Sequence, residues 1–147
     1  MKERILILFM VIILIPSLVF PGGLTKTEKR KIESDATEVF DKIFHLWKDG
    51  KFEDLYEYGY RRNQTSISKE DFVMKMKNKS YELASSWETI RDLEAEVASL
   101  KLVYVKAKIG YKKKGGGDTK FLTGTYRVEF EGDQWRMDLS KILRSPF

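Results

Sequence analysis

Cysteine is absent from this chain of 147 residues, and histidine occurs only once, as His45. Without cysteine the chain cannot form disulfides, a thiol nucleophile, a thiolate metal site or a lipid-modified cysteine behind an N-terminal leader. A metal site needs several ligands, and a single histidine leaves only carboxylates to complete one. We therefore expect neither a metal nor any other cofactor.

An excess of one charge sign is also nearly missing. The 27 basic and 22 acidic residues give a net charge of +5, and loss of residues 1–23 would lower it to +4 because they hold Lys2 and Arg4 against Glu3. Nucleic-acid-binding proteins concentrate far more positive charge on one face. Both signs are interspersed here, as on a solvated surface, so no nucleic-acid partner is expected.

A long hydrophobic run occurs only at the N-terminus. Lys2 and Arg4 precede an unbroken apolar segment at 5–15, which a proline then interrupts. This pattern is typical of a secretory signal peptide, and the run is shorter than the roughly 20 apolar residues of a spanning helix. No Ala-x-Ala cleavage motif follows, so an uncleaved anchor over residues 5–20 stays an open alternative. Residues 1–23 therefore predict export to the periplasm or the cell exterior, with membrane contact only if the leader is retained.

The remainder has the composition of one folded domain. Aromatic residues make up 13% of the chain, which predicts a packed core rather than disorder. Residues 24–34 are polar and charged, and we predict a linker there, or the frayed start of a helix. The domain itself is expected over residues 35–147.

Helical periodicity dominates the first half of this domain. Apolar residues from Ile32 to Trp47 recur three and four positions apart, and Gly50 is placed to end that helix. A second helix is predicted over 52–60, followed by a loop over 61–67. Ser68 is then expected to cap a third helix that buries Phe72 and Met76.

The second half changes to a period of two. Alternation of apolar and polar residues predicts strands over 103–111, 122–130 and 135–139, with a glycine-rich hairpin turn at 113–118. Residues 87–100 are compatible with a helix or a strand, and we favour a strand because the sheet needs a fourth partner. Gly110 and Gly124 are expected nearly opposite each other, where they would bend the sheet.

The expected fold class is α+β: N-terminal helices packed on a curved antiparallel sheet of about four strands, in a cone-like, cystatin-like roll. Three segments in this order also carry a family resemblance: 47–56 (WKDGKFEDLY), 68–72 (SKEDF) and 133–139 (DQWRMDL). Over residues 35–143 the chain resembles the nuclear transport factor 2-like superfamily, in particular its small exported bacterial members of unknown function. The resemblance implies a curved sheet that helices wrap into a cone with a pocket.

That superfamily includes ketosteroid isomerases, dehydratases, polyketide cyclases, transport adaptors and non-catalytic ligand-binding or protein-binding domains, so its fold assigns no activity. Inside such a cone, eight large side chains are expected either to pack as a core or to line an apolar pocket. These candidate pocket residues are Phe44, Trp47, Tyr56, Tyr60, Phe72, Met76, Trp87 and Tyr126.

No catalytic residue can be assigned from the sequence. His45 lies off or at the edge of the apolar stripe of its helix, and Asp92, Glu94 and Glu96 are expected on the outer side of a strand. Asp138 alternates with apolar residues, but no partner carboxylate accompanies it. Lysines 112–114 form a basic tip with the glycine turn, which we interpret as a solvated hairpin end.

The function expected from these observations is a non-enzymatic exported domain that binds a small apolar ligand or a partner protein in the cell envelope. Two alternatives stay open. The first is a pocket enzyme of the ketosteroid isomerase or dehydratase kind, which needs a carboxylate or histidine inside the cavity. The second is a dimeric structural domain, because relatives often pair through the open face of the sheet.

Overall fold

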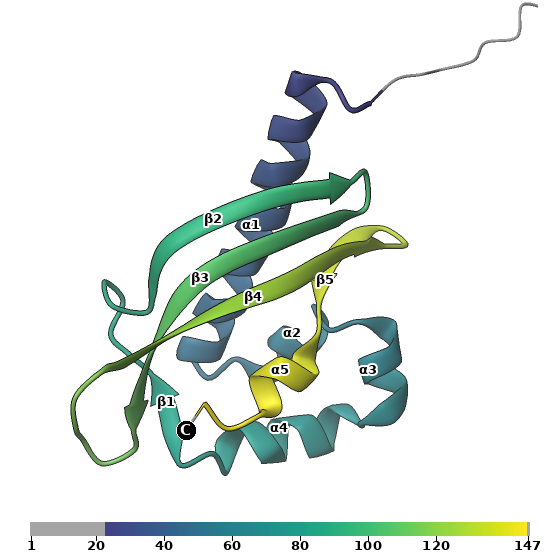
Figure 1. Ribbon diagram of the computed structural model, residues 1–147. Coiled ribbons are helices and arrows are strands. Elements are labelled where there is room, and N and C mark those ends of the chain that lie inside the picture. The colour runs from purple at the N-terminus through teal and green to yellow at the C-terminus, as the bar shows by residue number, and fades with distance from the viewer. Residues whose placement is uncertain (1–22, 147) are drawn as a thin grey trace, which may run out of the picture.

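The computed structural model describes residues 23–146 and has the α+β architecture that the sequence predicts (Figure 1). Helices occupy the first half, and a strongly curled antiparallel sheet follows them. The leader predicted for residues 1–23 lies outside the described residues except for its last one. Within the described part, no helix is long and apolar enough to cross a membrane.

The first helix, α1 (Lys26–Lys48), is longer than predicted. The side chain of Thr25 accepts a hydrogen bond from the backbone of Glu28, and the Glu28 carboxylate accepts one from Thr25 in return. This capping box satisfies two backbone donors and starts the helix. Of the two alternatives for 24–34, the helix start therefore holds from Lys26 onward and the linker is wrong there. Figure 1 shows the first turns of α1 extending past the edge of the sheet.

Three short helices follow: α2 (Phe52–Tyr56), α3 (Arg61–Ser66) and α4 (Lys69–Lys77). The prediction for α4 is confirmed, because the Ser68 hydroxyl accepts from the backbone of Asp71 at 3.1 Å. The predicted second helix ends early, at Tyr56. The loop predicted over 61–67 is wrong, since six of its residues form α3. The start of α3 is fixed by a residue distant in the sequence, because the backbone nitrogen of Tyr60 donates to the carbonyl of Met137.

The sheet comprises β1 (Tyr81–Leu83), β2 (Ile90–Ser99), β3 (Leu102–Lys113), β4 (Lys120–Glu131) and β5 (Gln134–Met137). All their pairings are antiparallel, and β3 lies at the centre. One edge of β3 pairs with β4, while its other edge pairs with β1 at one end and with β2 along the rest. The strand favoured within 87–100 is confirmed as β2, and the short β1 was not predicted.

Two further predictions about the sheet are corrected. Gly110 pairs with Phe121 and Gly124 pairs with Ala107, so the two glycines do not lie opposite each other. The last strand ends at Met137, and α5 (Leu139–Leu143) follows it. The Asp138 carboxylate accepts from the backbone of Ser140 at 2.9 Å, and this N-cap turns the chain into a helix.

The core lies between α1 and the concave face of the sheet. Alternate residues of β3 point inward, and all of them are buried: Val103, Val105, Ala107, Ile109 and Tyr111. The stripe on α1 that meets them consists of Ala36, Phe40, Ile43, Phe44 and Trp47. The outer face of the sheet is polar, which is the arrangement expected of an antiparallel sheet covered on one side only.

Candidate functional site

Most of the candidate pocket residues are buried in the hydrophobic core. Seven of the eight candidate pocket residues are buried: Phe44, Trp47, Tyr56, Tyr60, Phe72, Met76 and Tyr126. Phe44 stacks on Trp47 with ring centroids 5.7 Å apart and meets the ring of Tyr126 edge-on at the same distance. Tyr56 packs on Phe72 at 5.6 Å and joins α2 to α4. These contacts are those of a packed aromatic core.

Tyr60 is buried apart from the other six. It lies outside the main core cluster, its hydroxyl donates to the carbonyl of Arg127 at 2.8 Å, and the guanidinium of Arg62 covers its ring at 4.4 Å. Tyr60 therefore fastens the α2–α3 segment to β4.

Tyrosine hydroxyls are the main polar groups among the buried aromatic residues. Burial raises the pKa of Tyr111 and of Tyr126, so both phenols stay protonated at neutral pH. Among residues 23–146, Thr89 alone is a fully buried residue of the non-aromatic polar or charged types. One carboxylate oxygen is nevertheless buried: Oε1 of Glu129, which lies 2.7 Å from Nε of Arg127.

Trp87 is the exception among the eight candidates. Its side chain is 73% exposed, so the prediction that it lines the interior is wrong. The reason is its position in the turn over residues 84–89, which connects β1 to β2. The other two tryptophans, Trp47 and Trp135, are 6% and 7% exposed.

Backbone and hydroxyl contacts fix this turn at its two ends. The Thr89 hydroxyl lies 2.8 Å from the carbonyls of both Ala84 and Ser85. Gly110 donates its N–H to the carbonyl of Thr89 and accepts from the N–H of Ala84. A side chain at Gly110 would not fit, because a Cβ there would lie 2.5 Å from the carbonyl oxygen of Glu88.

Side chains hold the middle of the turn. The Glu88 carboxylate accepts from the hydroxyl of Thr119 at 3.1 Å and from that of Ser85 at 3.2 Å. It also lies 4.0 Å from the ammonium of Lys112. On the other side, Lys48 at the end of α1 donates to the hydroxyl of Ser86 at 2.8 Å. Trp87 is thus exposed on a turn that is anchored to both α1 and the β3–β4 hairpin.

Two neighbours complete a surface around this tryptophan. The guanidinium of Arg91 lies 4.1 Å from the ring centroid of Phe121 and 5.9 Å from that of Trp87. We call Trp87, Arg91 and Phe121 the Trp87 surface. Single exposed apolar residues are ordinary, but tryptophan and arginine are the residue types most enriched in the energetic centres of protein interfaces, where aromatic residues gather.

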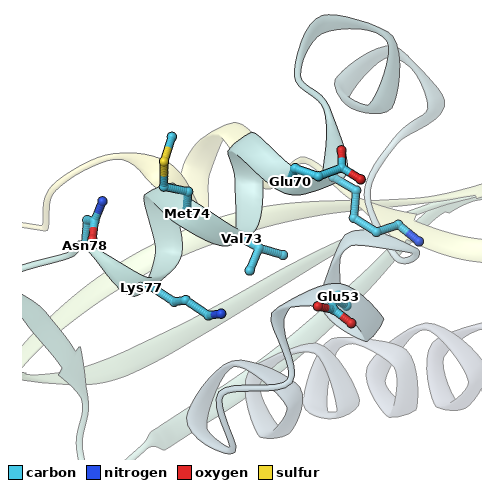
Figure 2. Close-up of a pocket in the computed structure, with 7 residues that line it drawn as sticks. Glu53, Glu70, Val73, Met74, Lys77 and Asn78 are labelled. Atoms are coloured by element: carbon cyan, nitrogen blue, oxygen red, sulfur yellow. The ribbon is translucent and has the colours of Figure 1, made fainter.

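A groove between α2 and α4 is the second surface feature, with a volume of about 590 Å³ (Figure 2). Val73 points from α4 toward the segment that carries Glu53, whereas Met74 points away from it. The remaining lining residues are polar: Glu53, Lys69, Glu70, Lys77 and Asn78. None of the eight candidate pocket residues lines this groove. One of the cations that line it, Lys69, already forms an ion pair with Glu57.

The other candidate residues do not come together as a site. His45 is exposed, and its Nδ1 atom lies 2.9 Å from the carbonyl of Asp41, one turn earlier on α1. Asp92 pairs with Lys108 at 2.6 Å and Glu94 pairs with Lys106 at 3.8 Å across the outer face. In the described part of the chain, no group of three or more histidine, aspartate or glutamate residues could hold a metal ion.

Asp138 has a structural role. Burial disfavours its charged form, but hydrogen bonds from Ser140 and Asn63 outweigh burial and lower its pKa. The basic tip is anchored to the end of α4, since the ammonium of Lys114 donates to the carbonyl of Lys77 at 2.8 Å.

Comparison with known proteins adds no assignment. No protein-family model matches the chain, and no curated protein matches it either. The resemblance to the nuclear transport factor 2-like superfamily therefore stays a prediction, and the functional argument rests on the surfaces described above.

Proposed function

We propose that this protein is a non-enzymatic domain that acts outside the cytoplasm and binds a partner protein of the cell envelope through the Trp87 surface. The observation that carries the proposal is the 73% exposure of Trp87 on a turn that four residues outside it hold in place: Lys48, Gly110, Lys112 and Thr119. A tryptophan on a rigid support loses little conformational freedom on binding, so it can contribute most of its apolar contact to affinity.

The interior supports a protein partner over an internal ligand. Seven of the eight candidate pocket residues are buried, and six of them belong to the main core cluster, as expected of packing residues. The hydroxyls that they bring are those of tyrosines whose pKa burial raises, not groups poised to exchange protons at neutral pH. A surface site needs no such cavity, and an interface can form around a few aromatic and arginine residues.

The test is affinity capture from envelope extracts of the source organism with three forms of the protein. The wild type is compared with Trp87→Ser and with Met74→Ser, which removes another exposed apolar side chain from α4. We expect one partner to be retained by the wild type and by Met74→Ser and lost from Trp87→Ser. Addition of that purified partner should then protect Trp87 from acrylamide quenching.

Two results would contradict the proposal. Equal retention of every protein by all three forms would show that Trp87 takes no part. A small molecule that stays bound to the Trp87→Ser form in native mass spectrometry would instead indicate that the protein binds a ligand in its interior.

A further inference from the structure

The strand β2 has one unpaired edge. It hydrogen-bonds to β3 on one side, and no strand within residues 23–146 pairs with its other side. On such an edge, alternate residues direct backbone N–H and C=O groups outward, where they can pair with another extended segment. This edge is separate from the Trp87 surface, although both involve the same strand.

Only part of the β2 edge is regular. A register shift between Arg91 and Glu94 accompanies Asp92, whose φ of 50° is unusual for a residue other than glycine, and a second shift lies between Val97 and Ser99. Bulges of this kind block pairing where they occur. The stretch from Glu94 to Val97 keeps a continuous register with β3 and is therefore the part open to a further strand.

A groove runs beside this stretch, with a volume of about 650 Å³. One wall is α1 and the other is β2, and Figure 1 shows α1 crossing behind β2 with its first turns beyond the strand. Leu93 and Ala95 supply apolar atoms on the strand side, and Leu93 is 37% exposed. A segment laid against the edge of β2 would therefore also contact α1, so that side chains as well as backbone would be recognised.

The charge of the groove is mainly negative. Glu33 and Glu38 on α1 and Glu94 on β2 line it, against the single cation Arg30. The ion pair of Glu94 with Lys106 is long, at 3.8 Å, and exposed on both sides, so it leaves much of the carboxylate available. Glu96, the next outward residue, faces Tyr104 across the sheet and adds a further negative charge to the edge.

We propose that the edge of β2 at residues 94–97 binds an extended, basic segment of a partner protein as an additional strand, with α1 as the second wall of the groove. Main-chain hydrogen bonds supply part of the affinity, and the glutamates select lysine or arginine side chains. This site goes beyond the proposed function because it uses residues that the Trp87 surface does not contain.

A second copy of the chain fits the edge less well. Antiparallel pairing of two β2 strands about Glu94, Ala95 or Glu96 places glutamates of the two copies opposite each other, because these positions are two residues apart. Like charges that face each other across a strand pair are destabilising. The edge therefore favours a segment of opposite charge over self-association.

The test uses the full chain, expressed with its own leader and purified after any processing by the cell. The probe is a fluorescein-labelled synthetic peptide of alternating lysine and valine, and its counterpart alternates glutamate and valine. Affinity is measured for the wild type, for Glu33→Lys/Glu38→Lys, and for the matched control Glu53→Lys/Glu70→Lys, which makes the same charge change at the α2–α4 groove. All four glutamates are exposed, so folding should be retained.

We expect the basic peptide to bind and the acidic one not to bind. Glu33→Lys/Glu38→Lys should weaken binding about tenfold, whereas the control should change it less than about twofold. Hydrogen exchange should slow on binding in residues 94–97. Equal weakening by the control pair, protection confined to other segments, self-association through β2 that the peptide does not displace, or no binding at about 1 mM peptide would each overturn the proposal.

These outcomes are independent of Trp87. Trp87→Ser should bind the basic peptide as the wild type does. Failure of the proposal about the β2 edge would therefore leave the proposal about the Trp87 surface untouched, and failure of the latter would leave the former untouched.

Discussion

The concave interior and the turn over residues 84–89 both carry tryptophan, yet the two regions use it in opposite ways. Trp47 is 6% exposed and packs on Phe44 and Tyr111, whereas Trp87 is 73% exposed and lies 5.9 Å from the guanidinium of Arg91. Burial of a large apolar side chain stabilises the fold by about 1.5–3 kcal/mol. The interior therefore holds the domain together, while the turn is itself held by its neighbours and leaves its tryptophan free to bind.

This difference also separates two kinds of polar contact. The hydroxyls of the interior are buried phenols, and their pKa is raised. The turn instead uses Glu88 and Thr89 to fix its own backbone, and the aromatic ring it presents makes no hydrogen bond that the structure records. A change in the interior should thus act on stability, and a change at position 87 should act on binding.

The largest effect is expected from Phe40→Ala. Phe40 is completely buried, and its ring lies 4.7 Å from that of Phe44 and 5.2 Å from that of Tyr126. Removal of the ring leaves a cavity that the surrounding side chains cannot fill, so the free energy of unfolding should fall by about 3–5 kcal/mol. Urea unfolding followed by circular dichroism measures it, with Leu100→Ala as the exposed control. Equal losses in both variants would contradict close packing around Phe40.

Gly110→Ala should cost less, about 1–3 kcal/mol. The new methyl group would meet the carbonyl oxygen of Glu88 at 2.5 Å, and that atom belongs to the backbone of the turn. The turn must therefore move away from β3. Leu100→Ala again serves as the control, because that side chain is 63% exposed. Unchanged stability in Gly110→Ala would mean that the turn is not held as closely as described.

A smaller effect, of the order of 1 kcal/mol, is expected from alkaline pH at Tyr81. Burial raises the pKa of Tyr81 from 10.0 to about 12, so its contribution to stability is complete below pH 10 and is lost as the pH rises through 12. The difference in free energy of unfolding between the wild type and Tyr81→Phe should therefore narrow from pH 10 to pH 12. Lys79, whose pKa burial lowers to about 8, is already neutral in that window.

Below pH 10, the wild type is expected to be more stable than Tyr81→Phe because the Tyr81 hydroxyl donates a hydrogen bond to the carbonyl of Arg144 at 2.6 Å. A difference in free energy of unfolding between the two proteins that stays constant up to pH 12 would contradict the raised pKa of Tyr81.

The smallest effect on stability is expected from Trp87→Phe, below about 0.5 kcal/mol, because the side chain is exposed. Its effect on fluorescence should be large. Trp87 is the exposed member of the three tryptophans, so most of the acrylamide-quenchable emission should disappear in Trp87→Phe and persist in Trp135→Phe. Strong quenching that survives Trp87→Phe would show that a buried tryptophan is accessible.

Much of the fold could be predicted from the sequence because a long helix or strand repeats its pattern of apolar residues over several turns or residue pairs. The stripe of α1, the Ser68 cap of α4 and the alternation of β3 and β4 each rest on several residues that agree. The short elements β1, α3 and α5 could not be found in this way. Their boundaries depend on partners distant in the sequence, such as Met137 for Tyr60 and Asn63 for Leu139.

The candidate site shows the same limit. Seven of the eight candidate pocket residues are buried, because aromatic residues at helix or strand spacing usually face a core. Trp87 satisfies the same spacing with Ile90 and Leu93, and composition alone cannot distinguish it. Its outward position is determined by Gly110 and Thr119, which are distant along the chain. The polar neighbours Ser85, Ser86 and Glu88 were the one local signal that the segment forms a turn.

The most direct test of the central claim is site-specific photo-crosslinking in the living host. A photoreactive phenylalanine analogue replaces Trp87 in one strain and Met74, which is also exposed, in another. If partner recognition occurs at the turn, ultraviolet light should yield a discrete protein adduct from position 87 and none from position 74. Adducts of the same mass and yield from both positions, or none from position 87, would contradict the account.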